Sequence, residues 1–259
     1  MLAGYDHLLR AADRLRWDEA QIDLRADAYA WHALAPALRD PLTRLFAGFW
    51  LAEHAVAEQL APFEAGAGKP ELAACFAAQA NDERRHARFF TRVAREVMGI
   101  DPPRDGRRLA GAAIVDLFEH DLPAAAGRLA AGERDLPEAV ALYHLVLEGI
   151  VFDVGQQAAL ELLDRAGTLP GVGDGMARVQ GDERWHVGLG VLCLAEAGID
   201  AKGVKESLTC AGRAAAAWGE AVPPGLVATA LRHHRRRLAE AGRGHGAGRA
   251  GSKGTPMFP

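Results

Sequence analysis

The same five-residue pattern, Asp-Glu-Arg-x-His, occurs twice in this chain, at Asp82–His86 and at Asp182–His186. Each copy places a Glu three residues before a His, and on a helix two residues at that spacing lie on one face, about one turn apart. A helix bundle that directs two such pairs inward, with one more Glu from each of two other helices, builds a dinuclear metal site. The repeat therefore predicts a helical, metal-binding bundle.

Two further glutamates complete the set. Glu53 follows an aromatic and aliphatic run, and Glu148 lies inside a long apolar segment. Carboxylates gathered in an apolar interior repel one another and resist desolvation, whereas two divalent cations would neutralise them. Oxygen and imidazole ligands together suit iron or manganese better than a thiolate-bound structural zinc. The predicted metal ligands are Glu53, Glu83, His86, Glu148, Glu183 and His186.

The hydrophobic period predicts four long core helices, bounded by Pro and Gly residues. Their approximate limits are 41–63, 70–98, 137–165 and 174–197, with an irregular segment at 109–131 broken at Pro123 and covering helices at 202–218 and after Pro224. Short turns within each pair and a long excursion between the second and third helices match a ferritin-like four-helix bundle. We expect an all-α ferritin-like domain over residues 1–241 and a disordered Gly-rich tail over 242–259.

The composition fits a single large domain of 259 residues with a mild net charge of −4, which does not favour a nucleic-acid binder. The three cysteines form no Cys-x-x-Cys pair, and we find neither a signal segment nor an apolar stretch that could span a bilayer. We therefore expect a cytoplasmic protein with no membrane span. The basic run at 232–237 is interpreted as a solvated helix end rather than a phosphate site.

The segments around these residues resemble the ligand-binding oxidases that are similar to the small subunit of ribonucleotide reductase. The resemblance extends roughly from Trp17 to Leu194 and is carried by 53–56, 81–86, 143–149 and 178–190. It implies a centre of one manganese and one iron, or of two irons, that activates dioxygen and has a long-chain fatty acid bound at the metals. It also implies one metal subsite formed by Glu53, Glu83 and His86, and another formed by Glu148, Glu183 and His186.

The resemblance further implies a covalent ether link between a Val and a Tyr beside the metals, and Val56 and Tyr143 stand at those positions. Val56 lies three residues after Glu53 and should share its inward face. Tyr143 lies five residues before Glu148, about 140° around an α-helix, so it should border the site rather than point into it.

Three positions depart from related patterns. Phe90 stands where radical-forming reductase subunits carry a Tyr, and Gln156 replaces a Tyr expected near a fatty-acid head group. Val179 stands where arylamine N-oxygenases carry an additional His. Asp182 is expected to hydrogen-bond a ligand His, as Asp82 could also do, and Gln156 is expected to border the ligand pocket.

These observations predict an oxidoreductase, active as a homodimer, that uses dioxygen to oxidise a C–H bond of an apolar, fatty-acid-like molecule. The alternatives are a di-iron monooxygenase or N-oxygenase of a biosynthetic pathway, a ribonucleotide reductase small-subunit-like protein, and an iron-storage or scaffold protein. Phe90 disfavours the reductase role, and Val179 disfavours the N-oxygenase.

Overall fold

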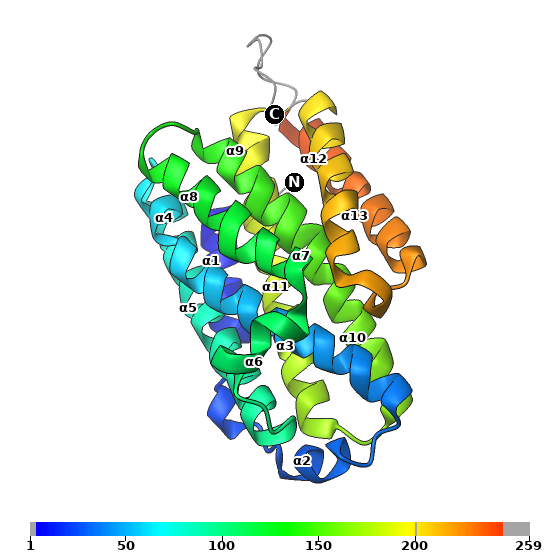
Figure 1. Cartoon of the computed structure of the whole chain (residues 1–259). Coiled ribbons are helices and arrows are strands. Elements are labelled where there is room, and N and C mark those ends of the chain that lie inside the picture. Colours follow the sequence, from blue (N-terminus) through cyan, green and yellow to red (C-terminus); the bar gives the residue numbers. More distant parts are fainter. Residues whose placement is uncertain (1–3, 200, 246–259) are drawn as a thin grey trace.

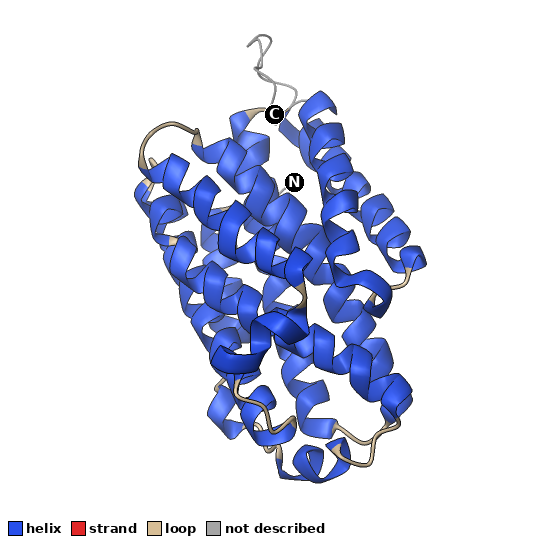
Figure 2. Ribbon diagram, viewed as in Figure 1, coloured by secondary structure: helices blue, strands red, loops and turns tan. Residues whose placement is uncertain are grey.

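The computed structural model describes residues 4–199 and 201–245, and every regular element in these ranges is a helix (Figures 1 and 2). The predicted all-α, ferritin-like fold is therefore confirmed. No helix among the described residues is both long enough and apolar enough to cross a membrane. The last helix continues to His245, past the expected domain boundary at 241, and residues 246–259 of the expected tail lie outside the described residues.

The four core helices occupy nearly the predicted segments. They are α3 (Pro36–Gln59), α5 (Pro70–Arg92), the continuous pair η4 (Ala141–Phe152) and α10 (Asp153–Ala166), and α11 (Pro170–Ala197). Two predicted starts were too late. Helix α3 begins at Pro36 with Pro41 inside it, and α11 begins at Pro170 rather than near Asp174. Both true starts place a Pro in the first helical turn, where its missing N–H costs no hydrogen bond.

The third core helix is not an ordinary α-helix along its whole length. Its first part, η4, is a π-helix, in which backbone hydrogen bonds join residues five apart instead of four. Residues five apart in η4 therefore lie about one turn from each other, on the same face. Glu148 belongs to this wider segment, so the angular relations expected from a 3.6-residue period do not apply around it.

Shorter elements cover the core. Before α3 come α1 (Tyr5–Leu15), η1 (Glu19–Gln21) and α2 (Arg25–Trp31). The excursion between the second and third core helices contains η2 (Val93–Val97), α6 (Pro102–Ala110), α7 (Ala112–Val115), η3 (Asp116–Asp121) and α8 (Leu122–Ala130), while α4 (Ala61–Ala65) and α9 (Leu136–Val140) flank core helices. Pro123 lies in the first turn of α8, and the predicted break in the helix at this residue does not occur, because η3 runs directly into α8.

The C-terminal helices lie against one side of the bundle. Helix α12 (Ala201–Ala214) packs on η4, and α13 (Pro224–His245) packs on η4, α10 and α11 (Figure 1). Between them η5 (Ala215–Ala221) carries Trp218, whose buried indole N–H donates to the Val151 carbonyl at 2.7 Å. This bond fixes the covering layer to the core next to the π-helix.

Helix α11 also reaches its neighbour by close backbone contact. A Cβ atom on Gly190 would lie only 2.1 Å from the Cβ of His144, so η4 and α11 can approach this closely only because position 190 lacks a side chain. A Cβ on Gly181, two turns earlier in the same helix, would meet no atom within 4 Å.

We predict that Gly190→Ala lowers the free energy of unfolding by about 1–3 kcal/mol, because the added methyl forces two packed helices apart. Gly181→Ala is the matched control and should raise it by up to about 1 kcal/mol, since Ala is the better helix former. Denaturant unfolding of the metal-free proteins measures both changes. Equal effects of the two substitutions would contradict the close approach of η4 and α11.

Candidate metal centre

The structure brings all six predicted ligand residues together in the middle of the bundle. Every one is buried, with exposed fractions from 0% to 7%. Glu53 comes from α3, Glu148 from η4, and each Glu-x-x-His pair from α5 or α11. Two sets of four side chains each offer ligand atoms within 4.8 Å of one another: Glu53, Glu83, His86 and Glu183 in one, and Glu83, Glu148, Glu183 and His186 in the other.

The two sets share Glu83 and Glu183, which the sequence had assigned to one subsite each. The imidazole Nδ1 atoms face the carboxylates: that of His86 lies 3.2 Å from a Glu83 oxygen, and that of His186 lies 3.2 Å from oxygens of both Glu83 and Glu183. Two carboxylates that belong to both sets are in position to bridge two ions. The cluster is thus arranged as two adjoining four-ligand sites.

A second layer of hydrogen bonds fixes the two imidazoles, and it crosses between the helices. His86 on α5 pairs through Nε2 with Asp182 of α11 at 3.0 Å, whereas His186 on α11 pairs with Asp82 of α5 at 3.4 Å. Arg85 donates to both carboxylates, at 2.6 Å to Asp82 and 2.9 Å to Asp182. With Nε2–H donating outward, Nδ1 is left free for a metal.

Each of these aspartates also accepts from an indole. Trp17 donates to Asp182 at 2.8 Å and Trp185 donates to Asp82 at 3.1 Å, so the two repeats build the same Trp–Asp–His arrangement on both sides. Asp182 therefore contacts one of the two predicted ligand histidines, His86, and Asp82 contacts the other, His186.

Sequence reasoning missed Gln79, a buried side chain that organises one side of the cluster. Its amide donates to Glu148 at 2.6 Å, to the Tyr143 hydroxyl at 3.0 Å and to Glu83 at 3.2 Å. Its carbonyl oxygen pairs with the ring of His144 at 3.0 Å, so this buried His holds Gln79 in place. A signal was available, since Gln79 lies four residues before Glu83 and hence on its face of the helix.

Tyr143 points into the site, whereas the sequence predicted that it would only border it. Its hydroxyl donates to Glu83 at 2.9 Å. The reason is the π-helix, which puts Tyr143 on the same face as Glu148, five residues later. Tyr143 and Val56 are both buried and both line one small cavity, too narrow to hold a water molecule, with Gln59, Leu60, Phe63 and Leu122.

In the metal-free cluster, burial and neighbouring charges raise the pKa of some groups and lower the pKa of others. Burial raises the pKa of Glu53, and burial together with the Glu183 charge raises the pKa of Glu148. Burial also acts on Glu83, but His186 and His86 on either side outweigh it and hold the pKa of Glu83 well below its usual range. The pKa values of His86 and His186 rise well above normal despite burial, because carboxylates face both rings.

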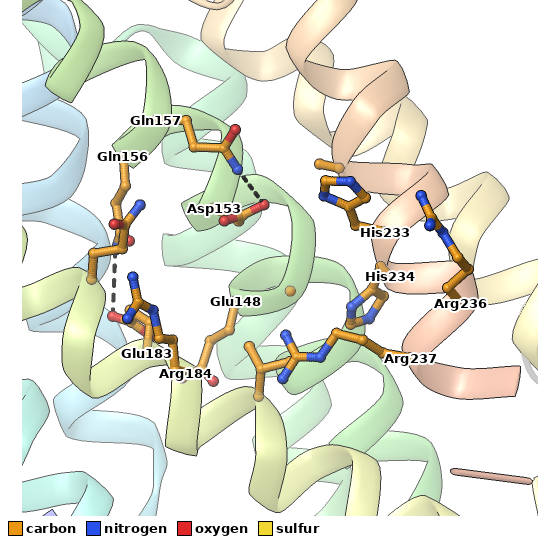
Figure 3. A pocket seen from close by; sticks show the side chains of 14 residues that line it. Glu148, Asp153, Gln156, Gln157, Glu183, Arg184, His233, His234, Arg236 and Arg237 are labelled. Atoms are coloured by element: carbon orange, nitrogen blue, oxygen red, sulfur yellow. Dashed lines mark hydrogen bonds between the residues drawn. The ribbon is translucent and has the colours of Figure 1, made fainter. Parts of the chain in front are cut away.

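Gln156 lies at the opening of the cluster toward α13. Its side chain is 3.5 Å from a Glu183 oxygen and lines a cavity of about 520 Å³ that also reaches Glu148 (Figure 3). Phe90 is fully buried against Phe49, with ring centroids 5.2 Å apart, and Val179 is fully buried as well. These two positions therefore belong to the apolar core, whereas Gln156 borders a polar cavity.

Solved structures share this fold. One variant of an R2-like ligand-binding oxidase, with an anaerobically reconstituted Mn/Fe cofactor, matches with a TM-score of 0.75 and 22% identity over 93% of each chain. A second variant, with an aerobically reconstituted Mn/Fe cofactor, has a TM-score of 0.75 and 20% identity over 93% of each chain. A third carries a non-activated Mn/Mn cofactor and has a TM-score of 0.74 and 22% identity over 93% of this chain and 92% of that one.

At these identities the likeness establishes the fold alone. Membership of a family comes from the sequence itself, because residues 5–208 match the family defined as "ribonucleotide reductase, small chain". This match includes all four core helices and all six residues of the cluster. The chain belongs to the ribonucleotide reductase small chain family.

Proposed function

We propose that this protein is an oxidoreductase with a dinuclear metal centre that activates dioxygen and oxidises a C–H bond. The observation that carries the proposal is the pair of overlapping four-ligand sets that share Glu83 and Glu183. Four carboxylates buried in one bundle need compensating positive charge, and two divalent cations match them. The proposed ligands are Glu53, Glu83, His86, Glu148, Glu183 and His186.

The donor set supports manganese and iron, one of each, or two irons. Carboxylate oxygens and imidazole nitrogens suit these metals, and neither of the two ligand sets contains a thiolate. Similar structures hold Mn/Fe or Mn/Mn cofactors, which supports the same choice. When bound, such a pair would supply the electrons that reduce dioxygen.

The chain's own residues would hold this centre rigid and control access to it. Asp182 and Asp82 keep the two imidazoles in one tautomer, and Arg85 joins the two aspartates. Gln79 fixes Glu148 and Tyr143 through donated hydrogen bonds. The packed rings of Phe49 and Phe90 contribute an apolar core, and the cavity beside Gln156, which reaches Glu148 and Glu183, offers a route for a substrate.

The rival functions within this family and fold are weaker. Phe90 cannot form a tyrosyl radical, which disfavours a reductase role, and Val179 offers no extra ligand of the N-oxygenase kind. A monooxygenase would use the same centre and differ in the fate of the oxygen atoms, so product analysis with labelled dioxygen separates it. A homodimer remains a prediction; a solution mass near that of a dimer would support it and would also exclude an iron-storage cage.

An apolar, fatty-acid-like substrate also remains a prediction. The metal centre and the class of substrate are separate questions, because the cavity that reaches Glu148 and Glu183 is lined mainly by polar side chains. The oxidase proposal depends on the ligand cluster and stands whichever substrate class proves correct.

We predict that metal content follows the two overlapping sets. Glu53→Ala and Glu148→Ala each damage one set, so each should bind about one metal ion per chain, whereas Glu83→Ala and Glu183→Ala damage both and should bind neither ion stably. Melting temperature in the presence of metal should fall in the same order, since metal binding is linked to folding. Glu161→Ala, on the exposed face of α10, is the control. Full dinuclear loading of Glu183→Ala would refute the shared-ligand assignment.

We predict that metal binding releases protons and weakens as pH falls. In the metal-free cluster the raised pKa values of Glu53, Glu148, His86 and His186 mean that these groups keep their protons to higher pH than exposed groups of the same kind. Metal ions must displace these protons, so affinity rises with pH. Titration calorimetry in two buffers of different ionisation enthalpy measures the release. A binding enthalpy independent of the buffer would contradict this account.

We predict that Val56 and Tyr143 become joined by an ether bond when the metal-loaded protein meets dioxygen. Both residues line the same small cavity, and the Tyr143 oxygen touches the ligand Glu83. The Val56 β-carbon and the Tyr143 hydroxyl would each lose one hydrogen atom, with dioxygen as the oxidant. Peptide mapping should then show the two peptides as one species, lighter than their sum by two hydrogen atoms. Tyr143→Phe is the control, and two unmodified peptides in the aerobic wild type would exclude the bond.

A further inference from the structure

The basic run at 232–237 is exposed except at His234, as expected for a solvated helix end, but it also borders a cavity. Four of its residues, His233, His234, Arg236 and Arg237, line the cavity of about 520 Å³ that reaches Glu148 and Glu183. Figure 3 shows these side chains of α13 on one side of the cavity and the polar side chains of α10 on the other. The run therefore lies beside the proposed metal centre, although it follows that centre's last ligand by more than forty residues.

Several arginines border this cavity. Arg184 of α11 and Arg236 of α13 form no ion pair or side-chain hydrogen bond with any other residue in the described part of the chain, whereas Arg237 interacts electrostatically with Asp153 of the same lining. Arg85 and Arg92 are instead held in ion pairs, with Asp82 and Glu96 respectively. Three guanidinium groups around one opening, two of them without an ion pair, attract an anion from solution.

A buried polar group in the same wall also lacks a partner. His234 is only 3% exposed, and its Nε2 has no hydrogen-bond partner. The ring lies against Gly149, where a Cβ would come within 2.6 Å of His234 Cε1 and 2.8 Å of Nε2. The missing side chain at position 149 thus lets this imidazole approach the backbone next to Glu148, so α13 packs tightly beside the proposed centre.

The rest of the lining is polar. Gln156, Gln157 and Gln180 offer amide donors and acceptors, and one oxygen of Asp153 is held by Gln157 at 2.8 Å. The aliphatic members are Val187 and Ala230, too few to form an apolar tunnel. Ligand sites that are selective for apolar chains are lined mainly by hydrophobic and aromatic side chains, which this cavity does not have.

We propose that the substrate of the metal centre is a small polar organic acid, whose carboxylate is held by Arg184 and Arg237 while its oxidisable carbon faces Glu148 and Glu183. The guanidinium fork matches a carboxylate with two parallel hydrogen bonds. The amide side chains would take hydroxyl or carbonyl groups of the same molecule. This proposal rests on the proposed function, because it names the substrate class of the same site.

The test measures binding of two probes with six carbons and one carboxylate each, gluconate and hexanoate, to the metal-loaded full-length protein without dioxygen. Gluconate should bind more tightly than hexanoate, because the lining is polar. Affinity should stay flat along the series from butanoate to palmitate, whereas an apolar pocket would gain about fourfold per added methylene. A steady gain along the series would overturn the proposal in favour of a fatty-acid site.

Variants locate the site. Arg184→Gln and Arg237→Gln should each weaken gluconate binding roughly tenfold, the loss expected for one hydrogen bond to a charged group. Arg235→Gln is the matched control, since Arg235 belongs to the same basic run, is exposed and does not line the cavity. Equal affinities of the Arg237→Gln and Arg235→Gln proteins would show that the run is only a solvated helix end.

The outcomes separate this proposal from the proposed function. None of these arginines belongs to either ligand set, so metal content and melting temperature of the variants should match the wild type. Absence of two metal ions from the wild-type protein would refute the metal centre itself. If the metal content were normal but gluconate bound no more tightly than hexanoate, only the proposed substrate class would be refuted.

Discussion

Charge balance in the middle of the bundle is the constraint on which the rest of this structure depends. Four glutamates from four helices meet where water is excluded, and their burial strongly disfavours four negative charges. In the metal-free protein, the pKa shifts indicate that protons on some carboxyl groups and on both imidazoles reduce this charge. Any cation that replaces these protons removes the same strain and joins the helices, so the bundle is built to be completed by metal.

The order of the core helices and the identity of the clustered residues could be predicted from the sequence because both follow from local geometry. A Glu three residues before a His shares its face on any regular helix, and apolar flanks direct that face inward. The repeat also carried Asp82 and Asp182 at fixed offsets. Which Asp serves which His could not be predicted, since the crossed pairing depends on how α5 and α11 lie against each other.

Other features were missed because no local signal distinguishes them. The π-helical period of η4 turns the Tyr143 side chain toward the site. The sequence of η4 gives no sign of this, because it is an apolar run like that of any buried helix. Gln79 looks like one more polar residue on α5 until its contacts with Glu148 and His144 are seen. Pro41 was taken as a helix start, although the helix accommodates it one turn further in.

Gln156 and the basic run at 232–237 seemed unrelated in the sequence, but both border the same cavity in the structure. Gln156 stands in place of an expected Tyr on α10, and the basic run belongs to α13, some eighty residues later. An amide beside Glu183 and the cationic side chains of α13 make this wall polar, while Phe90 packs against Phe49 in the apolar core. We therefore propose that the ligand cluster holds the metals while this polar wall selects the substrate.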